Sequence, residues 1–341
     1  MTELLSVRQL RTSFLTRDGE VQSVRGVSFD VREGEVIGIV GESGSGKSVT
    51  AKSLIGLIPP PGVIREGEVL YRGENLLALP EKRLRQIRGN RIAMIFQDPM
   101  TSLNPVVKVG AQIIEVLQRH KKLSKQAARA EAIALLRKVG IPSPEERIDQ
   151  YPHEFSGGMR QRAMIAMALS CQPEILIADE PTTALDVTIQ AQILGLMKQL
   201  RDTTNTAILL ITHDLGVVAQ VCTRVVVMYG GLIMEEGSVH DIFERPMHPY
   251  TQGLLRSIPK VAAGERERLF SIEGTPPNLL HPPAGCPFQD RCPHAMEQCR
   301  QLPPYAVTET GHRSLCWLQH DAPGITLEAA NPEEVKQHEQ A

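Results

Sequence analysis

The sequence GESGSGKS at residues 41–48 contains residue types that bind phosphate groups, in a characteristic spacing. Its glycines let backbone N–H groups turn inward around phosphate oxygens at the electropositive start of a helix. Lys47 would reach the β and γ phosphates of a nucleotide, and the Ser48 hydroxyl would bind Mg²⁺. A chance glycine-rich turn is the alternative, but an apolar run precedes the loop and a helix-like segment follows it. The residues expected to contact the nucleotide here are Gly41, Ser43, Gly44, Ser45, Gly46, Lys47, Ser48 and Val49.

Two adjacent carboxylates, Asp179 and Glu180, follow the apolar run at residues 175–178. Ligands of folds with parallel strands bind at the carboxyl ends of those strands. We therefore expect Asp179 to hold Mg²⁺ and Glu180 to polarise an attacking water molecule. A strand that runs into a solvated acidic turn is the alternative. The phosphate-binding sequence upstream favours nucleotide hydrolysis.

Short apolar runs alternate with longer segments of helical spacing along most of the chain. This alternation indicates an α/β fold with a largely parallel sheet that is covered on both faces. The predicted strands lie at residues 36–40, 92–96, 175–178, 208–212 and 225–228.

Residues 98–170 are predicted to form a helical subdomain within a main domain at residues 1–245. Ser124 is a predicted N-cap in this subdomain, and Gly140 is a predicted helix stop. Prolines accumulate after about residue 245, so a small irregular C-terminal domain is expected at residues 246–320. The polar stretch at residues 321–341 is expected to be a disordered tail.

Composition excludes several classes of protein. The chain has 341 residues, more than the roughly 250 to 300 at which one core stops growing, so more than one packed unit is expected. A net charge of −2 argues against a nucleic-acid partner. No apolar run reaches the roughly 18 residues that span a bilayer, and the first residues lack a signal-peptide pattern. We therefore expect a cytoplasmic protein without disulfides.

Four further motifs resemble those of the ATP-binding-cassette (ABC) ATPases. The sequence FSGGMRQR at residues 155–162 is similar to the family signature, although Met159 replaces the commonest glutamine. Gln97 resembles the glutamine of the Q-loop, Asp186 the aspartate of the D-loop, and His213 the switch histidine. The resemblance covers about residues 5–240 and implies an ABC-type P-loop nucleotide-binding domain with a mixed sheet core and a helical subdomain.

The resemblance also implies a role for each residue of the site. Glu180, His213 and Gln97 would be catalytic, with His213 sensing the γ-phosphate. Mg²⁺ would be held by Ser48, Gln97 and Asp179.

The signature residues are implied to act on a second subunit. They would contact ATP bound by a neighbouring cassette, so that two cassettes close head to tail on ATP and separate after hydrolysis. Phe14 resembles the aromatic residue that stacks on adenine, and an ordinary core residue of a strand is the alternative. The residues acting across the dimer would be Ser156, Gly157, Gly158 and Met159.

Four cysteines gather near the C-terminus, whereas Cys171 and Cys222 stand alone in apolar surroundings and are predicted to be buried thiols. The spacing of the four leaves an iron–sulfur cluster, a structural Zn²⁺ and unliganded thiols open. The four are Cys286, Cys292, Cys299 and Cys316.

The region from His248 to Cys316 resembles the C-terminal domain of the oligopeptide and dipeptide permease ATPases. This resemblance implies a [4Fe-4S] cluster on the four cysteines, with Zn²⁺ as the alternative. It also implies a motor for import of di- or oligopeptides that is peripheral at the cytoplasmic face of the inner membrane. The implied partners are a paralogous ABC ATPase, two transmembrane permease subunits and an extracytoplasmic substrate-binding protein.

Other functions remain open at this point. The same motor could serve nickel or another small solute. A soluble ABC ATPase of translation or DNA repair is a further alternative, although the chain lacks the second cassette or long coiled coil of such proteins. A redox sensor built on the four cysteines is the third.

Overall fold

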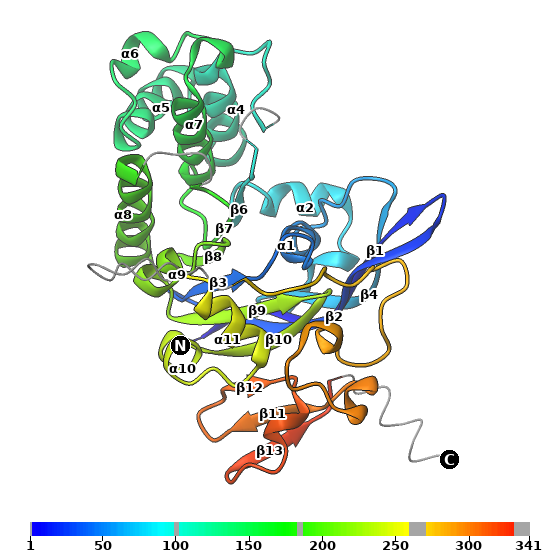
Figure 1. Ribbon diagram of the computed structural model, residues 1–341. Coiled ribbons are helices and arrows are strands. Elements are labelled where there is room, and N and C mark those ends of the chain that lie inside the picture. Colours follow the sequence, from blue (N-terminus) through cyan, green and yellow to red (C-terminus); the bar gives the residue numbers. More distant parts are fainter. Residues whose placement is uncertain (1, 99–101, 183–186, 259–270, 331–341) are drawn as a thin grey trace, which may run out of the picture. The chain divides into compact units, whose positions relative to one another are not determined.

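The computed structural model describes residues 2–98, 102–182, 187–258 and 271–330, and the chain divides into two compact units (Figure 1). The first unit consists mainly of Arg32–Val36 and Ala78–Ile211. The second contains Glu3–Val31, Ile37–Leu77 and the described residues from Thr212 onward. Among the described helices, none combines the length and the apolar character needed to cross a bilayer.

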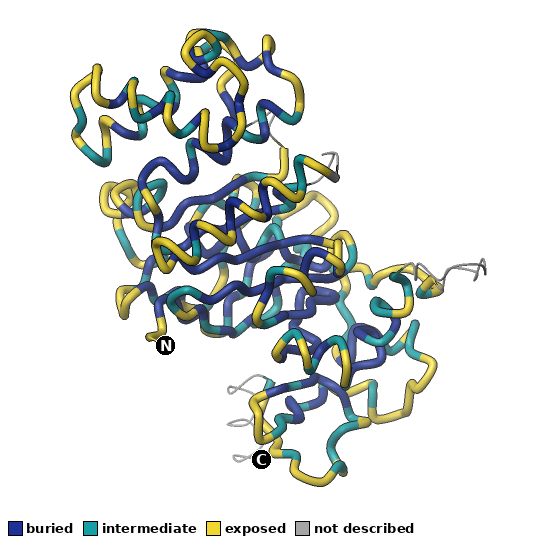
Figure 2. Tube along the Cα trace, turned by 90° about the vertical axis from the view of Figure 1, so that its left-hand side faces the viewer, coloured by how far each residue is buried: buried dark blue, intermediate teal, exposed yellow. Residues whose placement is uncertain are grey.

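Three parallel strands form the centre of the first unit. They are ordered β6 (Ile92–Ile95), β7 (Ile175–Asp179) and β8 (Ala207–Ile211). Every residue of these strands is buried, which explains why the sequence shows continuous apolar runs (Figure 2). Because parallel strands end at one edge, the residues that follow β6 and β7 can meet there.

The predicted helical subdomain lies in the first unit (Figure 1). Ser124 caps its second helix by accepting a hydrogen bond from the Ala127 N–H at 3.2 Å, and Gly140 follows that helix with φ +73°. Both predicted helix boundaries are thus confirmed. The helices of this subdomain are α4 (Val109–Lys121), α5 (Lys125–Lys138), α6 (Pro144–Arg147) and α7 (Gly157–Leu169), and the unit also contains α2 (Glu81–Ile87), α8 (Val187–Thr204) and a 3₁₀ turn at Pro152–Glu154.

The second unit contains antiparallel pairings that the predicted parallel sheet did not include. The strand β3 (Val36–Val40) is parallel to β9 (Arg224–Tyr229), and β9 is antiparallel to β10 (Leu232–Ser238). Beyond β10 follow β12 (Arg313–Ser314), β11 (Tyr305–Thr308) and β13 (Ile325–Glu328), all antiparallel.

A separate sheet of the same unit has the order β2 (Gly19–Arg32), β1 (Glu3–Thr16), β4 (Gly62–Tyr71) and β5 (Glu74–Asn75). The helices of this unit are α1 (Lys47–Leu54), α9 (Leu215–Val221), α10 (Val239–Glu244) and α11 (Pro249–Arg256).

The C-terminal region is fastened to β10 by buried carboxylates. Glu235, which is fully buried, accepts hydrogen bonds from the backbone N–H groups of Met247 at 2.6 Å and His248 at 2.9 Å, and it also pairs with His312 Nε2 at 2.8 Å. A buried carboxylate is tolerated only when its oxygens are occupied in this way. The region after residue 245 therefore belongs to the same compact unit as the first strands, and the predicted boundary at residue 245 does not separate the units.

The predicted disordered tail is wrong in its first part. Ile325–Glu328 forms β13, which pairs with β11 in a register that places Ala306 opposite Leu327. The polar composition of the segment did not indicate this short strand, because the strand forms by pairing with the free edge of β11. Residues 331–341, the rest of the predicted tail, lie outside the described residues.

Candidate functional site

The glycine-rich loop at residues 41–48 connects β3 to α1, as the sequence predicts. A Cβ atom on Gly41, which has φ +146°, would lie 2.1 Å from the backbone oxygen of Met228. A Cβ on Gly46, with φ +101°, would lie 2.4 Å from the backbone oxygen of Ser23. Only glycine fits at these two positions, because a side chain would collide with neighbouring backbone.

Lys47 places its ammonium group against the loop itself. Its Nζ donates hydrogen bonds to the backbone oxygens of Gly41 and Glu42, both at 2.8 Å, and to Ser45 Oγ at 3.3 Å. The residue is 7% exposed, so these acceptors replace water around a nearly buried charge. Phosphate oxygens would be stronger partners for the same ammonium group. Ser48, the next residue, lies in the first turn of α1.

The two carboxylates follow β7 in different environments. Asp179 is the last residue of the strand and is 1% exposed. Glu180 has φ +47°, a left-handed conformation that a non-glycine residue adopts at a cost, and its N–H donates to the backbone oxygen of Ile211 at 2.9 Å. Glu180 is half-buried, whereas Asp179 before it is buried.

Gln97, which follows β6, reaches Glu180 directly. Its Nε2 donates a hydrogen bond to Glu180 Oε2 at 3.0 Å. The parallel pairing of β6 with β7 explains this contact, because both strands end at the same edge of the sheet. The structure therefore brings together two of the three residues predicted to be catalytic.

The signature sequence forms the start of α7. Ser156 is the N-cap, and its Oγ accepts a hydrogen bond from the Met159 N–H at 3.3 Å. Ser156 and Gly157 are exposed and Gly158 is half-buried, whereas the Met159 side chain is buried. The outward face of this helix start is therefore made of a hydroxyl and backbone N–H groups, which suit an anion.

Gln161, one turn into α7, was not singled out in the sequence. It is 1% exposed and donates from Nε2 to the backbone oxygen of Pro181 at 2.7 Å. This hydrogen bond links the signature helix to the residue that follows Glu180. The sequence signal for Gln161 is its place in the signature segment at residues 155–162.

The remaining predicted residues lie in the second unit or outside the described residues. His213 is exposed and follows the buried Thr212, whose N–H donates to the Ile39 oxygen at 3.3 Å. Phe14 is half-buried on β1 opposite Gly62 of β4, where a Cβ would lie 2.8 Å from the Phe14 ring. Asp186, the predicted D-loop residue, lies outside the described residues.

The four C-terminal cysteines all line one small pocket beside His248 and Trp317. Cys286 and Cys316 are buried, and Cys292 and Cys299 are half-buried. Burial, reinforced by the charges of the neighbouring thiols, raises the pKa of Cys286 to about 12. Sulfur is a soft ligand that suits iron or zinc. In their present arrangement, the described His, Cys, Asp and Glu side chains contain no set of three placed to hold a metal ion.

The two isolated cysteines behave as predicted. Cys171 and Cys222 are each 9% exposed, and neither forms a disulfide. Burial raises the pKa of Cys222 to about 12. These thiols are core residues.

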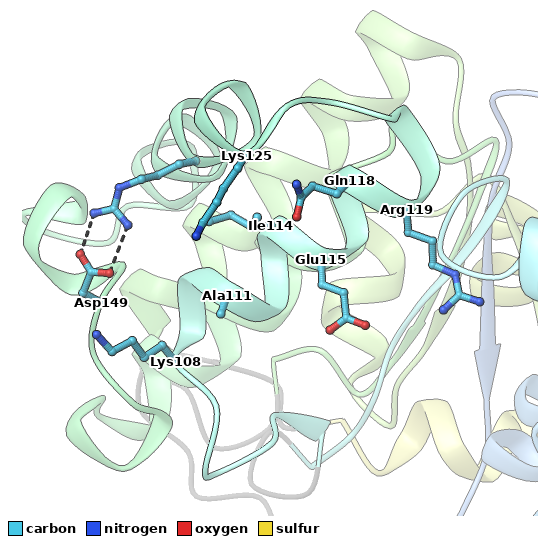
Figure 3. Close-up of a pocket in the computed structure, with 9 residues that line it drawn as sticks. Lys108, Ala111, Ile114, Glu115, Gln118, Arg119, Lys125 and Asp149 are labelled. Atoms are coloured by element: carbon cyan, nitrogen blue, oxygen red, sulfur yellow. Dashed lines mark hydrogen bonds and ion pairs between the residues drawn. The ribbon is translucent and has the colours of Figure 1, made fainter.

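An open pocket on the helical subdomain lies between α4, α5 and the end of α6 (Figure 3). Arg129 and Asp149 close one side with two hydrogen bonds of 3.1 and 2.6 Å. Glu115 and Arg119 project from α4 along the other side, and none of the predicted nucleotide residues lines the pocket. Charged side chains line the pocket together with the apolar residues Ala111 and Ile114.

Comparison with known proteins decides the family. Residues 24–183 match the family described as ABC transporter, and residues 234–299 match the family described as oligopeptide/dipeptide transporter, C-terminal region. The chain is 56% identical over 321 residues to the dipeptide transport ATP-binding protein DppD of Bacillus subtilis, an alignment that covers 94% of this chain and 96% of that protein. It is 54% identical over 314 residues to the oligopeptide transport ATP-binding protein OppD of Escherichia coli, covering 92% and 93%. The chain belongs to this family of peptide-transport ATP-binding proteins.

The solved structures of ABC cassettes agree with this assignment. A dimeric cassette in a post-hydrolysis state, bound to ADP and phosphate, matches this ABC ATPase with a TM-score of 0.64 and 26% identity. The match covers 69% of this chain and 99% of that chain. The expected ABC-type fold with a mixed sheet and a helical subdomain is therefore confirmed, and the chain is an ABC-type ATPase subunit.

Proposed function

We propose that this ATPase hydrolyses MgATP to energise the uptake of di- and oligopeptides through a membrane importer. The observation that carries the proposal is the 3.0 Å hydrogen bond between Gln97 and Glu180. It places a carboxylate that can orient water beside a glutamine, at the sheet edge where ligands of such folds bind. The peptide-transport names of the relatives support the substrate class.

In this proposal the predicted residues bind the nucleotide, hold Mg²⁺ and act on the attacking water, with Gln97 both catalytic and a ligand of Mg²⁺. Backbone N–H groups of the loop and the Lys47 ammonium neutralise the phosphates, and the ring of Phe14 stacks on the adenine. Glu180 orients the attacking water, and His213 contacts the γ-phosphate. Mg²⁺ would be held by Ser48, Gln97 and Asp179, and the other nucleotide contacts would be Gly41, Ser43, Gly44, Ser45, Gly46 and Val49.

The signature would act on the ATP of a second cassette. The exposed hydroxyl of Ser156 and the uncovered helix start at Gly157 support this assignment. Closure on ATP would form a sandwich dimer, and hydrolysis would release it. A paralogous ATPase subunit is the proposed partner, with Gly158, Met159 and the D-loop residue Asp186 also at the interface.

The pocket of Figure 3 supports docking on the membrane subunits. It lies on α4, in the part of the helical subdomain that would receive a short cytoplasmic helix of a permease subunit. Its charged lining can select the partner helix. We place the ATPase at the cytoplasmic face of the inner membrane, with two permease subunits and an extracytoplasmic substrate-binding protein.

The four cysteines are proposed to bind a [4Fe-4S] cluster, with Zn²⁺ as the alternative. Their shared pocket supports this idea, and a bound group would stabilise a region that has little core of its own. Purification without oxygen, followed by iron and sulfide analysis, tests it. We expect Cys292→Ser to lose the iron and Cys222→Ser to retain it. Stoichiometric zinc without iron would overturn the cluster.

Reconstitution tests the transport function. The chain would be assembled with its partner ATPase, permease subunits and binding protein in vesicles, and ATP-dependent uptake of a labelled dipeptide would be measured. Lys47→Ala should abolish uptake. Stimulation of ATP hydrolysis by nickel but not by peptides would favour the other solute class, and hydrolysis that responds to no solute would contradict an importer.

A further inference from the structure

Glu42, the second residue of the glycine-rich loop at residues 41–48, is held by side chains from the C-terminal region, which is distant in sequence. Its backbone N–H donates a hydrogen bond to the Tyr250 hydroxyl at 2.8 Å. Its carboxylate accepts two hydrogen bonds from Arg291, Nη1 to Oε2 at 2.7 Å and Nη2 to Oε1 at 3.1 Å. A paired arrangement of this kind fixes both position and orientation.

Arg291 is itself held rigidly. Its side chain is 6% exposed, and its remaining N–H groups donate to the Tyr229 hydroxyl at 3.0 Å and to the backbone oxygens of Ile272 at 3.0 Å and Glu273 at 2.9 Å. A planar guanidinium with this set of partners has little freedom to rotate. The contact with Glu42 is therefore built into the fold and is unlike a mobile surface ion pair.

Tyr250 is equally well fixed. It is fully buried, and its ring contacts those of Tyr229 and Phe288 at centroid distances of 4.6 and 5.3 Å. Phe288 lies two residues after Cys286, and Arg291 lies directly before Cys292. The segment that bears the cysteines thus also anchors the loop.

The hydrogen bonds of Lys47 indicate why the contacts of Arg291 and Tyr250 with Glu42 would matter for ATP binding. The Lys47 Nζ donates to the Gly41 and Glu42 carbonyl oxygens, both at 2.8 Å, and to Ser45 Oγ at 3.3 Å. An ammonium group has three N–H donors, so Lys47 has to release one of these loop partners to bind a phosphate oxygen. The loop then loses one of its internal hydrogen bonds. A loop that is fixed from outside keeps its shape during this exchange, so less binding energy is lost to ordering.

We propose that Arg291 and Tyr250 are positioning residues of the ATP site, which preserve the shape of the phosphate-binding loop when Lys47 transfers to the nucleotide. The inference rests on the proposed function, because it requires ATP in this loop. It assigns the C-terminal region a part in ATP affinity. Neither residue would touch the reacting atoms, so their loss should affect KM more than kcat.

The test compares full-length variants by steady-state hydrolysis and by binding of a fluorescent ATP analogue. We expect Arg291→Ala to raise KM and Kd for MgATP about tenfold, the size expected when a buried charged hydrogen bond is lost. The change in kcat should stay below about threefold, because the chemistry is untouched. Arg291→Lys should recover part of the affinity, since it retains charge without the paired geometry.

Arg313→Ala is the matched control. Arg313 is a half-buried arginine of the C-terminal region, but its carboxylate partner is Glu236 on β10, not a residue of the loop. We expect this variant to lower Tm and to leave KM for ATP unchanged. The proposal would be overturned if Arg291→Ala lowered Tm as much as Arg313→Ala does and still had the KM for ATP of the wild type.

A second variant keeps the test decisive if Arg291→Ala does not fold. Glu42→Gln retains the backbone hydrogen bond to Tyr250 and weakens only the ion pair, and it should also raise KM. An unchanged KM in this variant would reject the inference. The proposed function fails separately, when the wild-type protein neither binds nor hydrolyses ATP.

Discussion

Replacing Glu180 by glutamine separates ATP binding from hydrolysis. Glutamine has the same size, and its amide oxygen can still accept the 3.0 Å hydrogen bond from Gln97 Nε2. The backbone at φ +47° is equally accessible to both side chains. We therefore expect the free energy of unfolding to change by less than about 0.5 kcal/mol.

The effect on turnover should be large. A positioned carboxylate that accepts a proton contributes about 10²- to 10⁴-fold to a reaction rate. Its loss should raise the activation barrier by about 3 to 5 kcal/mol. Binding of MgATP should remain within about threefold of wild type, because Lys47 and the loop at residues 41–48 are unchanged.

Phosphate release at saturating MgATP measures kcat, and retention of labelled ATP measures binding. Glu174→Gln is a matched control, because Glu174 precedes β7 at its other end and pairs with Arg91 at 2.8 Å. That control should hydrolyse ATP normally. A Glu180→Gln protein with kcat within about threefold of wild type would refute the assignment of Glu180 as the residue that activates water.

Two further predictions concern packing and thiol reactivity. Gly110→Ala should lower the free energy of unfolding by about 1 to 3 kcal/mol, because its Cβ would lie 2.1 Å from Ile148 Cγ1. Gly195→Ala, in α8, should instead raise the free energy of unfolding by about 0.5 to 1 kcal/mol, because the space around its Cβ is open. Chemical denaturation measures both values, and the reverse order of the two variants would contradict the packing. Because burial raises the pKa of Cys222 to about 12, its thiol stays protonated at pH 8 in the folded protein. The thiol should therefore react with iodoacetamide only after unfolding, as measured by mass spectrometry. Rapid labelling of the native protein would contradict this prediction, because it would show that the thiol is accessible.

The sequence alone supports the prediction of a phosphate site at residues 41–48 and of two carboxylates at the end of a strand, because these features depend on consecutive residues. The glycines at residues 41–46, Lys47 and Ser48 act through consecutive backbone groups, so their spacing is enough to predict a phosphate site. The apolar run of β7 likewise indicates where Asp179 and Glu180 must lie. The contact between Gln97 and Glu180, by contrast, depends on the parallel pairing of β6 with β7 in the fold.

The tertiary structure alone decided the contacts that join distant parts of the chain. Arg291 is 249 residues from Glu42, and no local pattern relates them. The antiparallel strands after β10 and the strand β13 also depend on partner edges, not on strong propensity of their own. Local geometry is set by neighbouring residues, whereas long-range pairs depend on the path of the whole chain. For that reason the phosphate site at residues 41–48 is a prediction that the sequence alone supports, and only the fold shows what holds that loop in place.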